Sequence, residues 1–261
     1  RRQRQMCIRD RVREAPVGDA IECAPAEGID VYAYPQNETS TGAMLPVRRV
    51  AADGALTVVD ATSAAGGTKV DLAETDVYYF APQKNFGGDG GLWFAAVSPA
   101  AIERIERIAA SDRYIPEFLS LKHAVDNSRK NQTLNTPAIA SLLLLESQLE
   151  WLNASGGMDF AASRTNASSA IMYEWAEASS FATPFVSRPE IRSSVVATID
   201  LDERVDAAKA SAVLRENGIL DTEPYRKLGR NQLRIACFTS IDPSDIERLT
   251  KAIDWVVERL A

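Results

Sequence analysis

The sequence contains little histidine or cysteine. Of its 261 residues one is histidine, His123, and three are the scattered cysteines Cys7, Cys23 and Cys237, none of which forms a CxxC pair. A lone histidine cannot build a histidine-rich metal site or much of a charge relay, and such cysteine spacing gives no disulfide framework. We therefore expect no metal centre, reduced thiols, and a structural role for His123.

Long apolar runs and basic clusters in the body of the chain are also missing. No segment approaches the ~20 apolar residues of a membrane-spanning helix. The net charge of −7 argues against a nucleic-acid partner. Hydrophobic residues make up 46% of the chain and charged residues 25%, as is usual for globular proteins. These features predict a cytoplasmic protein with neither a membrane nor a nucleic-acid partner.

The amino terminus differs from the rest of the chain. Its first ten residues, RRQRQMCIRD, contain four arginines but no apolar core of a signal peptide. One interpretation is a basic targeting arm. We favour a non-native leader over residues 1–11, translated adapter sequence joined to an incomplete gene, with the native sequence starting near Val12.

The stretch with the most chemical content is YYFAPQKNFGGDGGLW, Tyr78–Trp93. Its β-prone start predicts a strand over Val77–Phe80, after which Lys84 precedes a glycine-rich segment. A lysine at the end of a strand can reach a ligand, and burial beside other cations would lower its pKa and make it a nucleophile. The alternative is a surface turn with a solvated lysine. A phosphate-binding P-loop is excluded because no Lys-Ser or Lys-Thr closes the glycine-rich segment.

An aspartate upstream favours the first interpretation. Asp60 ends the apolar run Leu56–Asp60, so an acid and a lysine follow two neighbouring predicted strands. In a parallel α/β sheet, ligands bind at the carboxyl ends of the strands. Pyridoxal phosphate chemistry requires this pair, a lysine for the internal aldimine and an aspartate on the pyridinium nitrogen.

Several segments together resemble phosphoserine aminotransferases, in particular the actinobacterial form. They span nearly the whole chain in the family's order: NETSTG (37–42), VVDATSAAGG (58–67), FAPQKNFGGDGGLW (80–93), KNQTLNTPAIA (130–140) and DTEPYRKLGRNQLR (221–234). The resemblance implies the α/β fold of type I pyridoxal-phosphate aminotransferases. It also implies that the amino-terminal part of the family's large domain is absent from this chain.

The resemblance assigns cofactor-binding roles to individual residues. Lys84 would form the internal aldimine and then move the substrate's α-proton as general acid and base, while Asp60 would hold the pyridinium proton. Gln83 would contact the cofactor phosphate. Thr39, in the Asn37–Thr39 segment, would bind the phenolic oxygen or the phosphate region, although a simple polar turn is the alternative for this segment.

A second group of residues points to a shared site. Asn135 and Thr136 match an Asn-Thr pair that reaches the cofactor phosphate of the other subunit, which implies a homodimer. A structural alternative is that Thr136, which precedes Pro137, caps a helix over Ala138–Asn153. Both functions are compatible because helix amino termini attract phosphate.

The arginines near the carboxyl terminus concern the substrate. Arg226, Arg230 and Arg234 lie within nine residues, and guanidinium groups pair well with carboxylates and phosphates. By resemblance Arg234 would hold the α-carboxylate, and Arg226 would help to bind the substrate phosphate from the neighbouring subunit. Family members often have a histidine before Arg226, where this chain has Tyr225. For Arg230 we favour a surface salt bridge.

The implied activity is transfer of an amino group between L-glutamate and 3-phosphohydroxypyruvate, giving O-phospho-L-serine and 2-oxoglutarate, with pyridoxal 5'-phosphate as cofactor. One alternative is another enzyme of the same fold, such as an alanine–glyoxylate aminotransferase; a cysteine desulfurase would need a loop cysteine that the chain lacks. Another is an inactive, truncated fragment.

The remaining pattern predicts two domains. We expect a partial large domain over 12–153 with a mostly parallel sheet, and a small α+β domain over 154–261. Further strands are predicted over 29–34, 92–97, 193–199 and 232–238, and helices after Ser98 and over 158–179, 205–216 and 246–260. The helix after Ser98 would bury Ile102, Ile105 and Ile108 in the core. Residues 122–135 are expected to form a polar loop.

Overall fold

The computed structural model describes residues 11–50 and 54–260. The predicted leader therefore lies outside the described residues, apart from Arg11. Within the described ranges, none of the helices has the length and apolarity needed to cross a bilayer.

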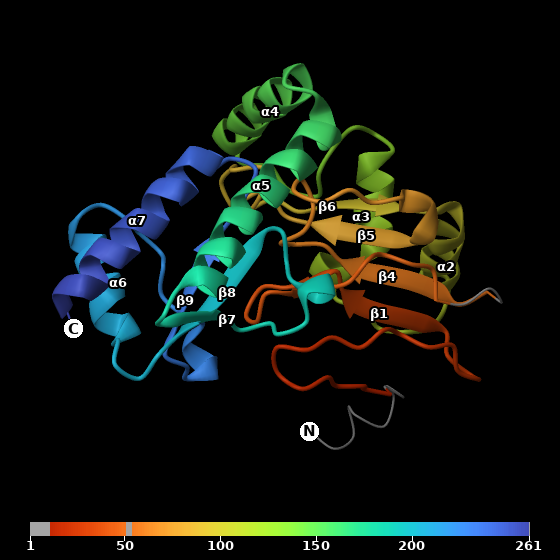
Figure 1. The fold of residues 1–261 in the computed structure, drawn as a ribbon. Helices are drawn as coiled ribbons and strands as arrows, with labels where there is room; N and C mark the ends of the chain where they lie inside the picture. Colours follow the sequence, from red (N-terminus) through yellow and green to blue (C-terminus); the bar gives the residue numbers. More distant parts are fainter. Residues whose placement is uncertain (1–10, 51–53, 261) are drawn as a thin grey trace.

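The first of two main sheets holds the strands around which the sequence analysis was built. Its order is β1-β4-β5-β6, with β1, β4 and β5 parallel and β6 antiparallel to β5. The strands are β1 (Val31–Pro35), β4 (Leu56–Asp60), β5 (Val77–Phe80) and β6 (Phe94–Val97). The limits predicted for β4 and β5 are confirmed. β6 joins the same sheet as expected, but its residues are only half-buried. The carboxyl ends of β1, β4 and β5 point toward the second sheet (Figure 1).

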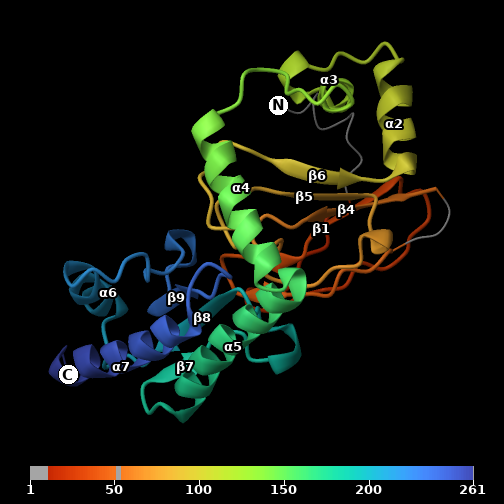
Figure 2. The same ribbon diagram turned by 90° about the horizontal axis from the view of Figure 1, so that it is seen from above.

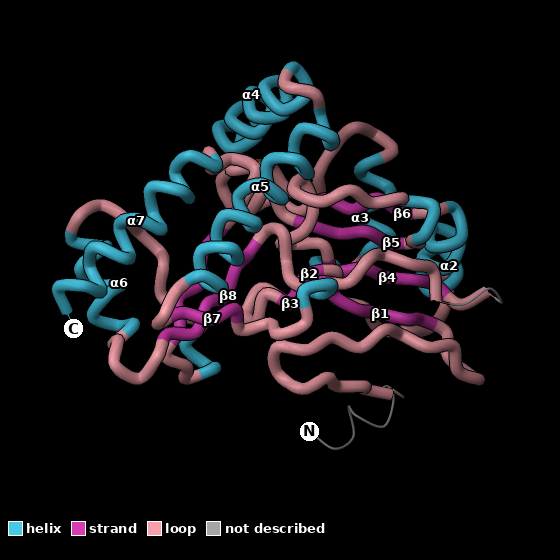
Figure 3. The backbone as a smooth tube through the Cα atoms, in the orientation of Figure 1, coloured by secondary structure: helices cyan, strands magenta, loops and turns pink. Residues whose placement is uncertain are grey.

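The second sheet is antiparallel and carries the larger core. It has the order β7-β8-β9, and the longer helices α5 and α7 pack against each other over it. Its elements are β7 (Ala182–Pro184), β8 (Val196–Leu201), β9 (Gln232–Ala236), α5 (Gly157–Ala178), α6 (Ala207–Glu216) and α7 (Pro243–Leu260). A short hairpin, β2 (Asn37–Glu38) and β3 (Ala43–Met44), lies between the two sheets (Figure 3).

Three further helices lie around the first sheet. They are α2 (Pro99–Ala109), α3 (Leu121–Ser128) and α4 (Ile139–Ala154), and α4 lies along the end of this sheet that faces the second one (Figure 2). Short 3-10 turns are η1 (Leu72–Glu74), η2 (Glu117–Leu119), η3 (Pro189–Ile191) and η4 (Arg226–Leu228). Ser98 caps α2 as predicted, its side chain accepting a hydrogen bond from the Ala101 amide.

Three expectations for this region are wrong. The segment predicted as a polar loop contains α3, because Ser120 caps a helical turn there and overrides the polar composition. Thr136 does not cap α4, whose N-cap residue is Ala138 and has no side-chain cap. The isoleucines of α2 are half-buried, and the buried residue of that helix is Ala101.

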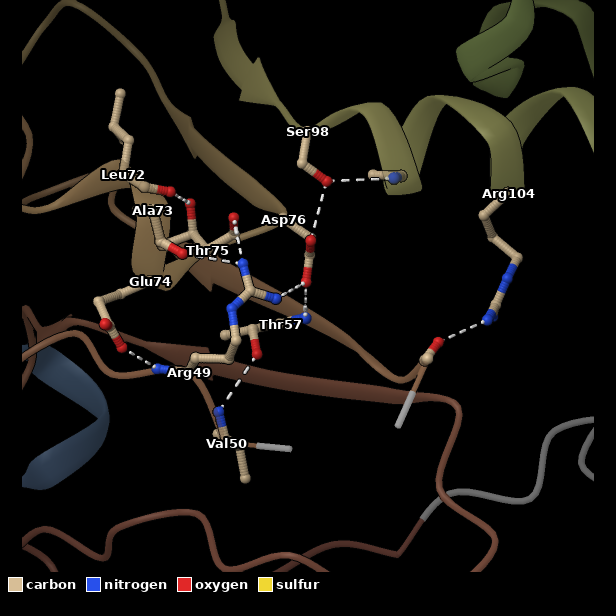
Figure 4. Close-up of polar contacts among 12 residues, drawn as sticks. Arg49, Val50, Thr57, Leu72, Ala73, Glu74, Thr75, Asp76, Ser98 and Arg104 are labelled. Carbon is tan, nitrogen blue, oxygen red and sulfur yellow. Dashed lines mark hydrogen bonds and ion pairs between the residues drawn. The ribbon is translucent and has the colours of Figure 1, made fainter. Parts of the chain in front are cut away.

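A buried carboxylate fastens the amino-terminal ends of the strands (Figure 4). Asp76 accepts hydrogen bonds from the Thr57 amide at 2.8 Å, from Arg49 Nη1 at 2.7 Å and from Ser98 Oγ at 2.8 Å. Burial raises the pKa of Asp76, but these hydrogen bonds outweigh it, so the pKa lies below its ordinary value. The network holds β4, β5 and the start of α2 together at the end opposite Lys84.

Candidate active site

Asp60 stands at the carboxyl end of β4, where the chain turns away from the sheet. Its Oδ1 accepts a hydrogen bond from the Thr62 amide at 2.9 Å, which fixes the start of the turn. In the sheet register Asp60 lies beside Tyr79 of β5. Burial raises the pKa of Tyr79, and the negative charge of Asp60 raises it further. The predicted placement of an acid at this edge of the sheet is thus confirmed.

The turn after Asp60, residues 61–68, is buried almost throughout and is held from both sides. Thr165 Oγ1 of α5 donates a hydrogen bond to the Gly67 carbonyl at 2.7 Å. Thr239 Oγ1, after β9, donates to the Gly66 carbonyl at 2.6 Å. Two threonines from the second sheet's side of the molecule thereby fix the turn that carries Asp60.

Asn85 connects this turn to the loop of Lys84. The residue is 1% exposed, and its side-chain Nδ2 donates to the Ser63 carbonyl at 2.9 Å and to the Ala65 carbonyl at 3.1 Å. Gly67 leaves room for it, because a Cβ at Gly67 would lie 2.3 Å from Asn85 Oδ1. The residue next to the predicted nucleophile is therefore anchored to the turn that begins at Asp60.

Lys84 lies beyond the end of β5 and is half-buried. Burial lowers the pKa of Lys84, and the positive charge of Arg234 lowers it further. The Lys84 Nζ lies 6.0 Å from the centre of the Phe238 ring. A lysine in this environment has a larger neutral, nucleophilic fraction at neutral pH than an exposed lysine. The surface-turn alternative is therefore disfavoured.

Arg234 and Thr39 lie close to each other and complete the group of residues around the site. Arg234, on β9, points its Nη1 at the Thr39 carbonyl, 3.5 Å away. Its guanidinium also lies 5.9 Å from the centre of the Tyr225 ring. Thr39 follows β2, and its hydroxyl donates to Ser63 Oγ at 2.7 Å. Residues far apart in the sequence thus surround one region at the carboxyl edge of the first sheet.

Other predicted site residues are not joined to this group. Gln83, Asn135, Thr136 and Arg226 are all exposed. Arg230 pairs with Asp200, the closer Nη2–Oδ2 distance being 2.5 Å, which agrees with the predicted salt bridge.

Sequence analysis missed Ser63, Asn85 and the two clamping threonines. Ser63 and Asn85 are small polar residues inside segments that were singled out for a neighbouring residue. The one available signal was their position next to Asp60 and Lys84.

The residues present fit a pyridoxal-phosphate site. Lys84, an amine of lowered pKa, and Asp60, a carboxylate at a neighbouring strand end, are the two groups that the chemistry of this cofactor uses, and Arg234 offers a cation for an anionic group. The fold matches that of pyridoxal-phosphate-dependent aminotransferases. The chain belongs to the class-V aminotransferase family, whose family model matches residues 17–221.

Within this family, the chain is similar to phosphoserine aminotransferases. The chain is 59% identical to phosphoserine aminotransferase of Corynebacterium glutamicum (strain R) over 245 residues, which is 94% of this chain and 65% of that protein. It is 61% identical over 250 residues to a Mycobacterium sp. (strain KMS) protein provisionally named phosphoserine aminotransferase, covering 95% of this chain and 68% of the relative. The chain therefore spans about two thirds of the length of these relatives.

Solved structures agree on the fold. A phosphoserine aminotransferase from Cytophaga hutchinsonii superposes with a TM-score of 0.83 at 21% identity, over 93% of this chain and 69% of that one. An aspartate aminotransferase from Thermus thermophilus gives a TM-score of 0.77 at 21% identity, over 90% and 66% of the two chains.

Proposed function

We propose that this chain is a phosphoserine transaminase. It would transfer an amino group between L-glutamate and 3-phosphohydroxypyruvate, giving O-phospho-L-serine and 2-oxoglutarate. The observation that carries the proposal is the position of Lys84. This amine of lowered pKa lies near Arg234, in the loop after β5, and β5 pairs with β4, the strand that ends at Asp60. The identity of about 60% to phosphoserine aminotransferases supports the substrate assignment.

When bound, pyridoxal phosphate supplies an aldehyde for the amine and a ring that accepts electrons from the substrate's α-carbon. Lys84 Nζ would hold the cofactor covalently, and after release by the substrate it would take up and return the α-proton. The Asp60 carboxylate would keep the ring nitrogen protonated. Arg234 would hold the substrate's α-carboxylate in a paired contact and orient the reacting carbon.

Thr39 would donate to an oxygen of the cofactor, and Gln83 would contact its phosphate. Asn135, Thr136 and Arg226 are exposed on this chain, as groups that serve a neighbouring copy would be. We therefore include a homodimer with shared sites in the proposal. We also propose two domains, over 12–153 and 154–261, because the strands of the first sheet lie in the first range and those of the second sheet in the second.

We also place the protein in the cytoplasm. Its Cys23 and Cys237 are free thiols in the part of the chain that the structure describes. Such thiols are usual in a reducing compartment.

Amino transfer from L-glutamate tests the proposal. 3-Phosphohydroxypyruvate, pyruvate and glyoxylate are compared as acceptors, with wild type, Lys84→Ala and the control Lys69→Ala, whose lysine pairs with Asp159 on the surface. We expect transfer to the phosphorylated acceptor only, abolished by Lys84→Ala and unchanged by Lys69→Ala. A preference for glyoxylate would support the alanine–glyoxylate type instead.

A further inference from the structure

Ser63 lies at the centre of a buried group of hydrogen bonds beneath the site. Its side chain is 2% exposed, and its Oγ accepts from Asn37 Nδ2 at 2.8 Å and from Thr39 Oγ1 at 2.7 Å. Ser63 Oγ also donates to the Asn37 carbonyl at 3.2 Å. The Ser63 carbonyl in turn accepts from Asn85, the neighbour of Lys84. Ser63 thus contacts both Thr39 and Asn85, the residue that follows Lys84.

The hydrogens of this group determine what Thr39 can offer a ligand. A hydroxyl has one hydrogen and two acceptor positions, so Ser63 uses its whole capacity here. Thr39 gives its only hydrogen to Ser63 and would present lone pairs to the site. An anionic oxygen requires a donor instead, so the hydrogens must rearrange before Thr39 can bind one.

The distances show how this can happen. The Ser63–Thr39 contact of 2.7 Å is ideal for a hydroxyl donor in either direction, whereas the Ser63 bond to the Asn37 carbonyl is longer, at 3.2 Å. If Ser63 turns its hydrogen to Thr39, the Thr39 hydrogen is released toward the site. The amide nitrogen of Asn37 can only donate, so it donates to Ser63 Oγ in both arrangements, and in the rearranged one the hydrogen bonds run from Asn37 through Ser63 to Thr39. Hydrogen bonds aligned in one direction strengthen each other.

We propose that Ser63 is a positioning residue that makes Thr39 a hydrogen-bond donor to an anionic oxygen of the bound cofactor. This inference rests on the proposed function, because it takes pyridoxal phosphate as the ligand. The shared chemistry is an anionic oxygen, either that of the ring or that of the phosphate group.

Cofactor binding tests the relay. The dissociation constants of pyridoxal phosphate, of its 3-deoxy analogue and of pyridoxal are measured by absorbance for wild type, Ser63→Ala, Thr39→Val and the double variant. The control is Ser211→Ala, which removes a buried hydroxyl without a partner in α6. We expect Thr39→Val, which removes the donor itself, to weaken pyridoxal phosphate about tenfold or more, the effect of one hydrogen bond to a charged group. Ser63→Ala should weaken it less, because Thr39 then lacks the hydrogen bond that directs its hydrogen to the ligand, and Ser211→Ala should leave it unchanged.

The analogues identify the oxygen. If Thr39 donates to the ring oxygen, Ser63→Ala has no effect on the 3-deoxy analogue; if it donates to the phosphate, the variant has no effect on pyridoxal. In the Thr39→Val background Ser63→Ala should add little, because it acts through Thr39. Losses that multiply independently, or that are equal for all three ligands, would overturn the inference. So would unchanged or tighter binding in Ser63→Ala, because Ser63 would then only compete with the ligand for the Thr39 hydrogen.

Asn37→Asp provides a second route if Ser63→Ala does not fold. It keeps the side chain's shape but replaces the donor with an acceptor, which draws the Ser63 hydrogen away from Thr39. We expect it to weaken pyridoxal phosphate more in the chain that keeps Thr39 than in the Thr39→Val background, because charge repulsion acts equally in both. Wild-type affinity in this variant would contradict the relay. Failure of wild type itself to bind pyridoxal phosphate would overturn both the relay and the proposed function.

Discussion

Replacing Asn85 is expected to loosen the loop that carries Lys84. Asn85→Ala removes two donors, at 2.9 Å and 3.1 Å from the Ser63 and Ala65 carbonyls. A buried carbonyl left without its donor costs about 1–3 kcal/mol, so the two carbonyls together cost about 2–6 kcal/mol. One effect acts in the opposite direction, because Asn85 Oδ1 is already buried without a partner and its removal relieves that penalty.

The balance predicts that Asn85→Ala lowers the free energy of unfolding by about 2–3 kcal/mol. Asn85→Asp should cost more at neutral pH, because an ionised carboxylate has no hydrogen to donate and faces two carbonyl oxygens. As the pH falls and this carboxyl group becomes protonated, it can donate one hydrogen bond. The difference between the two variants should then narrow.

Urea unfolding of the cofactor-free chain measures these values. The matched control is Asn127→Ala, which removes a similar bond, 2.8 Å to the His123 carbonyl, from the exposed surface of α3. We expect little change there, because the exposed carbonyl is hydrated and alanine favours a helix. Equal losses at Asn85 and Asn127, or an Asn85→Asp chain as stable as wild type, would refute the reasoning.

Three further predictions concern stability. Because the pKa of Asp76 is lowered, its contribution to stability is complete above the ordinary value of 3.8 and is lost as the pH falls through the folded-state pKa. Asp76→Asn should therefore cost about 2 kcal/mol at neutral pH and clearly less near about pH 3, measured by urea unfolding. Because the pKa of Lys84 is lowered, the unfolded chain binds more protons between the folded-state pKa and 10.5, so stability should rise with pH across that window. Lys84→Met should abolish this rise and stabilise the cofactor-free chain at neutral pH; a chain less stable than wild type would contradict it. Gly67→Ala would place a Cβ 2.3 Å from Asn85 Oδ1 and 2.7 Å from Val195 Cγ1. We therefore expect the free energy of unfolding, measured by thermal unfolding, to fall by about 1–3 kcal/mol. An unchanged free energy of unfolding would show that Asn85 and Val195 can move to accommodate the added methyl group.

Local patterns predicted the strands of the first sheet and the residues at their ends. β4 and β5 are apolar or β-branched runs bounded by polar or turn-forming residues, so their limits followed from the sequence. Asp60 is the last residue of β4, and Lys84 lies in the loop that follows β5. The resemblance to a family then supplied roles that no periodicity could provide.

Local sequence patterns could not predict the contacts between segments that are far apart in the sequence. Arg234 meets the Thr39 carbonyl only because β9 lies beside the short hairpin in the folded chain. Ser63 is a small polar residue in a turn, and nothing local shows that its hydroxyl has three partners. β7 has three residues, too few for a recognisable alternation.

The covalent bond between Lys84 and pyridoxal phosphate tests the central claim most directly. The visible absorption spectrum is recorded with pyridoxal phosphate for wild type and for Lys84→Ala, and the complex is then reduced with borohydride and mapped by mass spectrometry. We predict a visible band in wild type, its loss in Lys84→Ala, and a label on the peptide that contains Lys84. An equal band in both chains, or a label on another lysine, would contradict the assignment of Lys84.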